Sequence, residues 1–380
     1  RGRHRRHRDN PEGGRVTPQV HRLLMTLDAV GGVWRYAMDL AAGLRQRGTE
    51  IVFAGFGPHP TPAQLAEANA VGEYVHLDAP LDWTASDESE VGSVPSLIAD
   101  LAGRTGADLI HLNLPSQAAG LEVDIPVLVV SHSCVVSWFH VVRGSAVPPG
   151  WQWQQHLNQR GFDLADIVVA PSRSHADLLA KCYRGIEQVS VVHNSVRPIA
   201  GNAVHMPFII AAGRWWDEGK NAKTLDAAAR DCRWPVHMAG ANQAPNGHRT
   251  EVQNANLLGE LASPELRRLM AEASIFVSPS IYEPFGLAPL EAASAGLPLV
   301  LSDIPTYREL WDGAALFAEP ENPREFSHLL NRLADDTSLR AELGRRAMER
   351  AAGFTVDRQV NAMTAAYAKA LQPLALRAIA

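Results

Sequence analysis

The stretch SIFVSPSIYEPFGLAPLEAASAGLPLVLSD, residues 274–303, holds two short apolar runs on either side of an alanine-rich segment. The runs at 274–280 and 297–303 predict buried strands, because strands covered on both faces are continuously apolar. The segment between them predicts a helix that begins near Gly286 or Leu287. A strand, a helix and a second strand in this order are typical of parallel strands in one sheet.

The same alternation of strand and helix runs along most of the chain. Helix-period segments, such as residues 31–48 and 263–273, separate short runs rich in Val, Ile and Leu. The expected strands lie at 21–28, 50–57, 108–113, 127–132, 166–172 and 189–194, and then at 208–213, 236–240, 274–280 and 297–303. We therefore predict an α/β protein with two Rossmann-like domains that face each other across a cleft.

Composition suggests where the domains begin and end. Residues 194–205 contain Pro and Gly without an apolar period, as a linker does. We expect a first domain at 21–196 and a second at 205–352, preceded by a disordered basic arm at 1–20. Residues 353–380 are expected to form a C-terminal helix that can pack back on the first domain.

The charge of the chain is unevenly distributed. The formal net charge is −6, although five arginines lie within the first eight residues, so the remainder is clearly acidic. A basic tail on an acidic body is most simply a solvated arm. Binding of this arm to anionic lipid is the alternative that we keep, whereas we do not expect nucleic acid to be a partner.

The cysteines and the apolar runs limit the class of protein. Cys134, Cys182 and Cys232 form no CxxC pair, which argues against a zinc site or a disulfide framework and for a reducing compartment. The longest apolar runs, such as residues 125–130, are far too short to span a membrane. We therefore expect a cytoplasmic protein without a bound metal.

Two acids bracket the predicted helix start in the opening stretch. Glu283 lies on the loop, and Glu291 follows eight positions later within the helix. Free N–H groups at a helix N-terminus suit a phosphate, and a carboxylate can accept hydrogen bonds from a vicinal diol such as that of ribose. One ligand with a diphosphate between two hydroxyl-rich ends fits this spacing. The alternative is a turn at Glu283 and a solvated helix residue at Glu291.

Two cations follow the expected strand at 208–213. Arg214 comes directly after the strand, and Lys220 lies six positions later, just before a predicted helix. An arginine fork and a lysine point charge beside a helix N-terminus suit a diphosphate. The alternative is a surface loop in which Lys220 pairs with Asp217 or Glu218.

Two further positions follow strands of the first domain, where ligands of such folds bind. Gly31 and Gly32 separate the first strand from the first helix, as a phosphate or sugar loop or a plain tight turn would. They do not form the GxGxxG pattern of dinucleotide-binding proteins. His132 ends the run VLVVSH, where a structural histidine and a functional one are both open interpretations.

Taken in order, these segments resemble the retaining glycosyltransferases of family 4, which have the GT-B fold. The pattern E-x7-E from Glu283 to Glu291 carries most of the resemblance. Arg214 and Lys220, the Gly31-Gly32 loop, His132 and the motif VVHNSV at 191–196 match in the order of the family. Ser195 departs from the family, which usually has Gly there, and so does Ser133, where an acid often follows the histidine.

The resemblance assigns the phosphate-binding groups first. Arg214 and Lys220 would neutralise the diphosphate of a nucleotide-sugar donor and stabilise the departing nucleoside diphosphate. The backbone of Phe285, Gly286 and Leu287 would bind phosphate and donor-sugar oxygens. Because no DxD metal motif stands out and the two cations can supply the charge, we expect a metal-independent enzyme.

The resemblance also assigns the other ends of the donor. Glu291 would hold the ribose diol, and Glu283 a hydroxyl of the donor sugar. The backbone near Leu258 would contact the base, and His132 the donor sugar or the transition state. The Gly31-Gly32 loop of the acceptor-side first domain would close over the phosphates and the acceptor.

The implied function is transfer of a hexose, with retention of configuration, from a nucleotide sugar to a glycan or lipid-linked glycan in polysaccharide biosynthesis. UDP is the default nucleotide, because it is common in the family. A nucleotide-sugar epimerase on the same fold and a catalytically silent nucleotide-sugar-binding protein are the alternatives. A hydride-transferring dehydrogenase is disfavoured, because the GxGxxG pattern is absent.

The acceptor is poorly defined by the sequence. Residues 134–157 of the acceptor-side domain are rich in Trp and Val, and we expect core packing to explain most of them. One or two of the tryptophans, together with the basic arm, are consistent with transient docking on the inner face of an anionic membrane.

Overall fold

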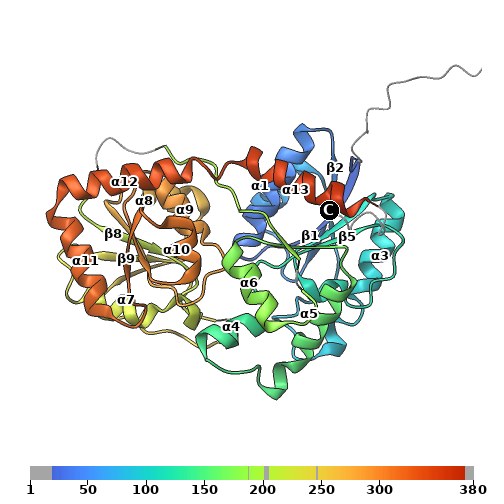
Figure 1. Cartoon of the computed structure of the whole chain (residues 1–380), viewed down its shortest axis with the longest axis horizontal. Helices are drawn as coiled ribbons and strands as arrows, with labels where there is room; N and C mark the ends of the chain where they lie inside the picture. The colour runs from blue at the N-terminus through green and yellow to red at the C-terminus, as the bar shows by residue number, and fades with distance from the viewer. Residues whose placement is uncertain (1–18, 187, 201–204, 245–246, 373–380) are drawn as a thin grey trace, which may run out of the picture.

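The computed structural model describes residues 19–186, 188–200, 205–244 and 247–372, which fold into two α/β domains (Figure 1). The basic arm predicted at residues 1–20 lies almost entirely outside the described residues. The predicted fold class, two Rossmann-like domains, is confirmed, because each domain is built on its own parallel sheet with helices on both faces.

The first domain contains a seven-stranded parallel sheet with the strand order β3-β2-β1-β4-β5-β6-β7. Its strands are β1 (Arg22–Asp28), β2 (Glu50–Phe56), β3 (Glu73–His76), β4 (Leu109–Leu112), β5 (Val127–Val130), β6 (Ile167–Ala170) and β7 (Val189–Val191). Its helices include α1 (Gly32–Gln46), α2 (Pro62–Val71), α3 (Val94–Thr105), α4 (Val135–Val142), α5 (Gln152–Leu164) and α6 (Arg173–Cys182). The central strands β4, β5 and β6 are buried throughout, which explains their unbroken apolar sequences.

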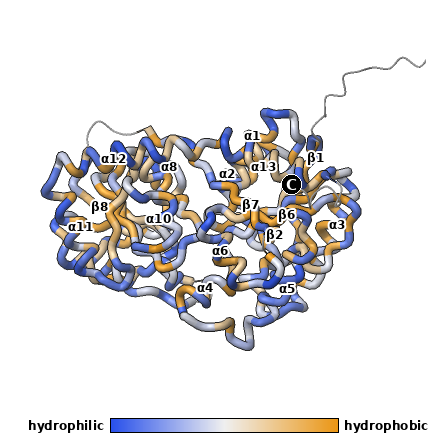
Figure 2. Tube along the Cα trace, viewed as in Figure 1, coloured by the Kyte–Doolittle hydropathy of each residue, from blue (hydrophilic) through white to orange (hydrophobic). Residues whose placement is uncertain are grey.

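The second domain contains a six-stranded parallel sheet with the order β10-β9-β8-β11-β12-β13. Its strands are β8 (Ile209–Ala212), β9 (Val236–Ala239), β10 (Asn256–Gly259), β11 (Ile275–Ser278), β12 (Leu299–Ser302) and β13 (Ala315–Ala318). Its helices include α7 (Ala222–Ala229), α8 (Ser263–Glu272), α9 (Leu287–Ser294), α10 (Pro305–Trp311), α11 (Pro323–Asp335) and α12 (Thr337–Ala351). Figure 2 shows apolar segments along the inner strands and hydrophilic segments along the outer helices.

The last helix, α13 (Val356–Ala370), leaves the second domain and packs on the first (Figure 1). Tyr367 is buried there, and its hydroxyl lies 2.7 Å from Nδ1 of His111 on β4. The chain therefore crosses between the domains twice. The two crossings run side by side, since the backbone N–H of Val196 donates to the carbonyl of Phe354 at 3.1 Å.

The domains touch where the carboxyl ends of their strands meet. Ser172 Oγ, at the start of α6, donates to the carbonyl of Pro284 in the second domain at 2.6 Å. The carboxylate of Glu309 on α10 accepts from the backbone N–H groups of Arg173 and Ser174 at 2.8 and 2.7 Å. Burial raises the pKa of Glu309, but side-chain hydrogen bonds from His193 and Ser174, together with these backbone bonds, lower it to about 2. In the described residues, no helix is both long and apolar enough to cross a membrane.

We expect Gly43→Ala to lower the free energy of unfolding by about 1–2 kcal/mol, because a tightly packed site resists extra volume. A Cβ at Gly43 of α1 would lie 2.5 Å from Cγ2 of Val360 on α13, a stiff side chain. Chemical denaturation monitored by circular dichroism measures the change.

The matched control is Gly103→Ala on α3, where a Cβ meets no atom within 4 Å. This substitution is expected to be neutral or to stabilise the protein by about 0.5–1 kcal/mol, through helix propensity. Equal effects of the two substitutions would contradict the packing of α13 against α1.

Candidate functional site

The loop after β8 presents the two predicted cations differently. Arg214 is exposed, lies over the ring of Trp216 at 5.4 Å, and is 3.7 Å from Oδ2 of Asp217. Trp215 points the other way, because its indole is buried and donates to the carbonyl of Ala239 at 2.9 Å. The guanidinium of Arg214 is thus held at the surface of the loop by neighbours on its own chain segment.

Lys220 forms an ion pair with the other loop of the site. Its Nζ lies 2.5 Å from Oε2 of Glu283, and only 18% and 14% of the two side chains are exposed. The sequence alternative, in which Lys220 pairs with Asp217 or Glu218, is wrong: the partner is the loop acid after β11. The two residues meet because β8 and β11 are neighbours in the sheet.

The residue after Lys220 is held in a rare conformation. Asn221 has a φ of 58°, and it is the one non-glycine residue with a positive φ in the described part of the chain. Its side-chain amide donates to the carbonyls of Pro279 and Pro320 at 3.0 and 2.7 Å. These bonds stabilise an otherwise unfavourable backbone and fix the position of Lys220.

The turn before α9 brings backbone N–H groups to the same place. Gly286 has a φ of 95°, and a Cβ there would lie 3.1 Å from the ring of Tyr307 and 3.4 Å from Cγ of Glu283. Phe285 is buried, with its ring centroid 5.8 Å from that of Phe354. The Phe285 side chain therefore anchors the turn, while Gly286 and Leu287 begin the helix.

Glu291 lies on α9 with a carboxylate that has no hydrogen bond or ion pair to any described residue. Burial raises the pKa of this carboxyl to about 7, while Arg267 and Arg35 lower it and Asp39 raises it. Glu291 is half-buried, so the alternative of an ordinary solvated helix residue does not hold. An unpaired acid in such surroundings is free to bind a ligand.

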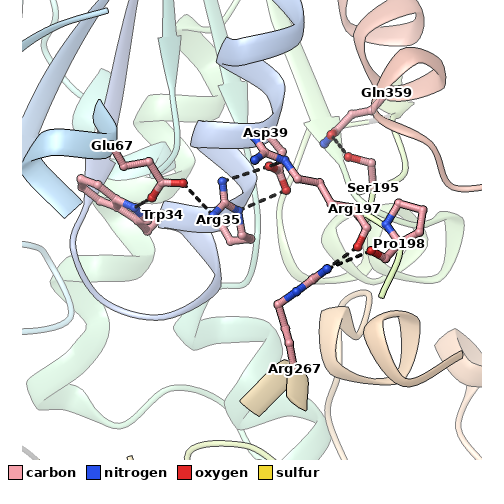
Figure 3. A network of polar contacts seen from close by, with 9 residues as sticks. All are labelled: Trp34, Arg35, Asp39, Glu67, Ser195, Arg197, Pro198, Arg267 and Gln359. Atoms are coloured by element: carbon pink, nitrogen blue, oxygen red, sulfur yellow. Dashed lines mark hydrogen bonds and ion pairs between the residues drawn. The ribbon is translucent and has the colours of Figure 1, made fainter. Parts of the chain in front are cut away.

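The cations near Glu291 belong to a polar network at the crossing between the domains (Figure 3). Asp39 on α1 accepts from Arg35 at 3.0 Å and from Arg197 of the linker at 2.7 Å. Arg267 on α8 donates to the carbonyls of Arg197 and Pro198 at 3.2 and 2.9 Å. The linker is therefore bound to a helix of each domain.

Ser195, which departs from the family pattern, belongs to the same region. Its hydroxyl donates to Oε1 of Gln359 on α13 at 2.7 Å (Figure 3). A glycine could not make this bond. Ser195 therefore links the first connection between the domains to α13.

The first domain brings its glycine loop to the start of α9. A Cβ at Gly32 would lie 3.2 Å from Cδ1 of Leu287, while Gly31 has a φ of 72° and open space around it. Both glycines are exposed. The loop and the helix N-terminus thus lie side by side although they belong to different domains.

His132 follows β5 and carries a neutral imidazole. Its Nε2 lies 2.7 Å from Oδ1 of Asn113, and Tyr36 packs edge-on at 4.4 Å between ring centroids. Burial lowers the pKa of His132 to about 3, with His111 and His175 contributing. Nδ2 of Asn113 donates to the carbonyl of Thr26, which leaves Oδ1 to accept. His132 therefore keeps its Nε2 proton, and Nδ1 can accept from a ligand.

Two buried acids of the first domain, Asp28 and Asp82, were not predicted from the sequence. Asp28 ends β1, and burial raises its pKa to about 6, while the nearby Arg214 of the other domain lowers it. Asp82 is also buried and accepts from Ser116 Oγ at 2.6 Å. The position of Asp28 at a strand end, three residues before Gly31, was a signal that could have found it. Asp82 follows no predicted strand.

Leu258 lies further out than the other candidates. It is in β10, the edge strand two places from β8, at a bulge between Leu257 and Gly259. Its proposed contact with the base stays a prediction. Within the described ranges, no group of three or more His, Cys, Asp or Glu side chains is placed to hold a metal ion.

The candidate site thus combines one ion-paired lysine, one exposed arginine, a helix N-terminus and an unpaired acid. The helix N-terminus and the arginine suit a diphosphate, and Glu291 suits hydroxyl groups next to it. The Gly31-Gly32 loop of the first domain lies against the start of α9, and the neutral His132 follows β5 of the same domain.

Two family descriptions match the chain. Glycosyltransferase Family 4 matches residues 30–198, which include the glycine loop and His132. Glycosyl transferases group 1 matches residues 206–350, which include both cations and both acids of the second domain.

Curated relatives include bacterial mannosyltransferases. The GDP-mannose:cellobiosyl-diphosphopolyprenol alpha-mannosyltransferase of Xanthomonas campestris is 30% identical over 204 residues, covering 49% of this chain and 51% of the relative. The O-antigen chain mannosyltransferase RfbU of Salmonella typhimurium is 33% identical over 181 residues, covering 44% and 50%. The chain spans about half the length of these relatives.

Solved structures share the fold over nearly the whole chain. Sucrose-phosphate synthase from Thermosynechococcus elongatus matches with a TM-score of 0.78 at 17% identity, covering 91% of this chain and 98% of that chain. Anabaena HepE in complex with UDP-glucose matches with a TM-score of 0.71 at 18% identity, covering 92% and 100%. At these identities the likeness concerns the fold alone.

Proposed function

We propose, because the chain belongs to glycosyltransferase family 4 and has the GT-B fold, that it transfers a hexose from a nucleotide sugar to a glycan or lipid-linked glycan acceptor, with retention of configuration. One observation carries this proposal. Three segments from distant parts of the sequence lie together between the two domains: Lys220, the stretch from Glu283 to the N-terminus of α9, and the Gly31-Gly32 loop.

The diphosphate of the donor would lie between Lys220, Arg214 and the first turn of α9. An ammonium group has three protons, so Lys220 can keep its bond to Glu283 and still donate to a phosphate. Negative charge grows on the leaving diphosphate as the sugar departs, and fixed cations and amide dipoles stabilise that charge. This electrostatic role needs no metal ion, and we propose that the reaction is metal-independent.

The ribose and the sugar of the donor would bind to acids at either side of the start of α9 and to His132. Glu291 would accept hydrogen bonds from the ribose diol, and Glu283 would bind a hydroxyl of the donor sugar beside Lys220. His132, with Nδ1 free to accept, would contact the donor sugar from the first domain. No acid is assigned as a covalent nucleophile, and the leaving phosphate would take the proton of the acceptor hydroxyl.

Two nucleotides, UDP and GDP, are proposed as carriers of the donor sugar. The family resemblance gives UDP as the default, whereas the relative from Xanthomonas campestris is named for GDP-mannose. Both nucleotides have the diphosphate and ribose that the site would recognise. The base would be bound near Leu258 on β10, where a bulge interrupts the pairing with β9.

A peripheral contact with an anionic membrane is proposed for the α4 end of the first domain. Val141 and Trp151 are 36% and 41% exposed, while Trp153 packs against the core. Arg143, on the same segment, is exposed and pairs with Glu218 at 2.6 Å, so an anionic headgroup would have to share the guanidinium with that acid. Exposed apolar side chains beside a cation suit the surface of anionic lipid, where a lipid-linked acceptor would lie.

The proposal is tested by thermal-shift measurements with UDP, GDP and ADP, and then with UDP-glucose and GDP-mannose. We expect at least one nucleoside diphosphate to raise the melting temperature, since a ligand at 100 times its Kd stabilises the folded state by about 2.7 kcal/mol. Lys220→Ala should lose most of the shift, and Lys223→Ala, on the same loop–helix segment, should keep it.

Product analysis completes this test. Transfer to a glycan acceptor is expected to continue in excess chelator. Release of an isomerised sugar without any acceptor would instead indicate an epimerase, and binding without turnover a silent binding protein. The absence of any shift with all nucleotides at millimolar concentration would contradict the proposed function.

The Kd for the nucleotide sugar should rise as the pH falls below about 7. The diol prefers the ionised form of Glu291, whose pKa in the free protein is about 7, so each lower pH unit should weaken binding by up to tenfold. The diphosphate of a nucleotide sugar does not itself titrate in this range. Isothermal titration calorimetry between pH 5.5 and 8 measures this, and Glu291→Gln should flatten the dependence. An unchanged slope in that variant would exclude Glu291 as its source.

Membrane docking is tested by co-sedimentation with phosphatidylcholine vesicles, with and without phosphatidylglycerol, at low salt. We expect binding only to the anionic vesicles, and Val141→Asp should reduce it. Leu65→Asp is the matched control, because Leu65 is similarly exposed, at 38%, but lies on α2. Loss of binding in both variants, or no binding at all, would remove the proposal.

A further inference from the structure

Helix α4 of the first domain reaches into the cation loop of the second domain. Nε1 of Trp138 donates to Oδ1 of Asp217 at 2.9 Å. The same oxygen accepts from the backbone N–H of Gly219 at 2.9 Å, and Oδ2 lies 3.7 Å from the guanidinium of Arg214. Asp217 therefore stands between a helix of one domain and the cation of the other.

The preceding residue of α4 contacts the second loop of the site. Ser137 Oγ lies 2.8 Å from the hydroxyl of Tyr282, directly before Glu283. The carbonyl of Gly219 accepts from the backbone N–H groups of Ile281 and Tyr282 at 2.9 and 3.3 Å. The loops that carry Lys220 and Glu283 are thus joined to each other and to α4.

The approach of α4 depends on a glycine. A Cβ at Gly219 would lie 3.0 Å from Nε1 of Trp138, so a larger residue would push the indole away from Asp217. At the outer side of the same contact, Arg143 pairs with Glu218 at 2.6 Å and lies over the Trp138 ring at 5.9 Å.

We infer that Trp138 is a positioning residue for the diphosphate-binding loop. Its indole N–H and the Gly219 N–H both bind Oδ1 of Asp217, and this keeps the aspartate directed toward the loop backbone. Without the indole N–H, the carboxylate is free to turn toward Arg214 and compete with the diphosphate for the guanidinium. The proposal assigns Trp138 no contact with the nucleotide sugar, only the contact with Asp217.

A consequence is that donor binding depends on the contact between the domains. The cations lie on the second domain, yet part of the structure that orients them comes from α4 of the first. The inference rests on the proposed function, because it concerns the same donor site.

Trp138→Phe keeps the aromatic ring and removes the N–H group. With GDP-mannose or UDP-glucose, whichever stabilises the wild-type protein, we expect the donor Kd and KM to rise about tenfold. The acceptor KM should stay within twofold. Trp234→Phe is the matched control, because Trp234 is another half-buried tryptophan, located before the amino end of β9 and against Arg340.

A double-mutant cycle separates positioning from a general structural effect. If Trp138 acts through Asp217, adding Trp138→Phe to Asp217→Ala should change the donor KM by less than twofold. Gly219→Ala should reproduce the donor-specific rise, and it serves in place of Trp138→Phe if that variant does not fold. Fully additive effects in the cycle, or an unchanged donor Kd in Trp138→Phe, would overturn the inference.

The two proposals fail in different ways. A wild-type protein that binds no nucleoside diphosphate refutes the proposed function and the inference with it. A wild-type protein that binds the donor, together with a Trp138→Phe variant of equal donor affinity, refutes the inference alone.

Discussion

The ion pair between Lys220 and Glu283 is the interaction on which the site depends. Both side chains are largely buried, and a buried charge without a partner would be costly. The pair joins the loops that follow β8 and β11, two neighbouring strands of one parallel sheet. The strained Asn221, the turn at Gly286 and the start of α9 all lie within a few residues of this pair, so their positions are fixed relative to each other.

The two domains contribute groups of different charge. The second domain supplies Arg214 and Lys220, while the first supplies Asp28, whose carboxyl has a raised pKa, and the neutral His132. A polyanionic ligand would therefore be held by the cations of the second domain. In the first domain it would meet a neutral imidazole and a carboxyl with a raised pKa. Burial raises the pKa of Glu291, whose carboxylate has no partner among the described residues, and of Asp28, which accepts one hydrogen bond from Val30. Glu309, which accepts several hydrogen bonds at the domain contact, has a lowered pKa instead.

Much of the fold could be predicted from the sequence, because the buried parallel strands are continuous apolar runs. Three strands were missed, namely β3, β10 and β13, and each lies at an edge of its sheet, where burial is incomplete and the apolar signal weak. The start of α9 could be located, because a Pro-Phe-Gly turn precedes an alanine-rich segment.

The candidate residues could be named from their positions after strands, but their partners could not. The contacts of Lys220 with Glu283 and of Trp138 with Asp217 join residues 63 and 79 positions apart. Such pairs depend on which strands are neighbours and on how the two domains dock. Local sequence patterns contain neither piece of information, and the only partners for Lys220 that they could offer were the nearby acids Asp217 and Glu218.

The hydrogen bond between Val196 and Phe354 joins the two connections between the domains side by side, so that they form one hinge. Arg267 of α8 donates a hydrogen bond to the first connection, and Ser195 of that connection donates one to α13. Sliding or separation of the two domains would stretch both covalent connections, whereas rotation about this hinge stretches neither. Rotation about this hinge is therefore the relative movement that the two connections resist least, and it would alter the contacts that α4 makes with the second domain.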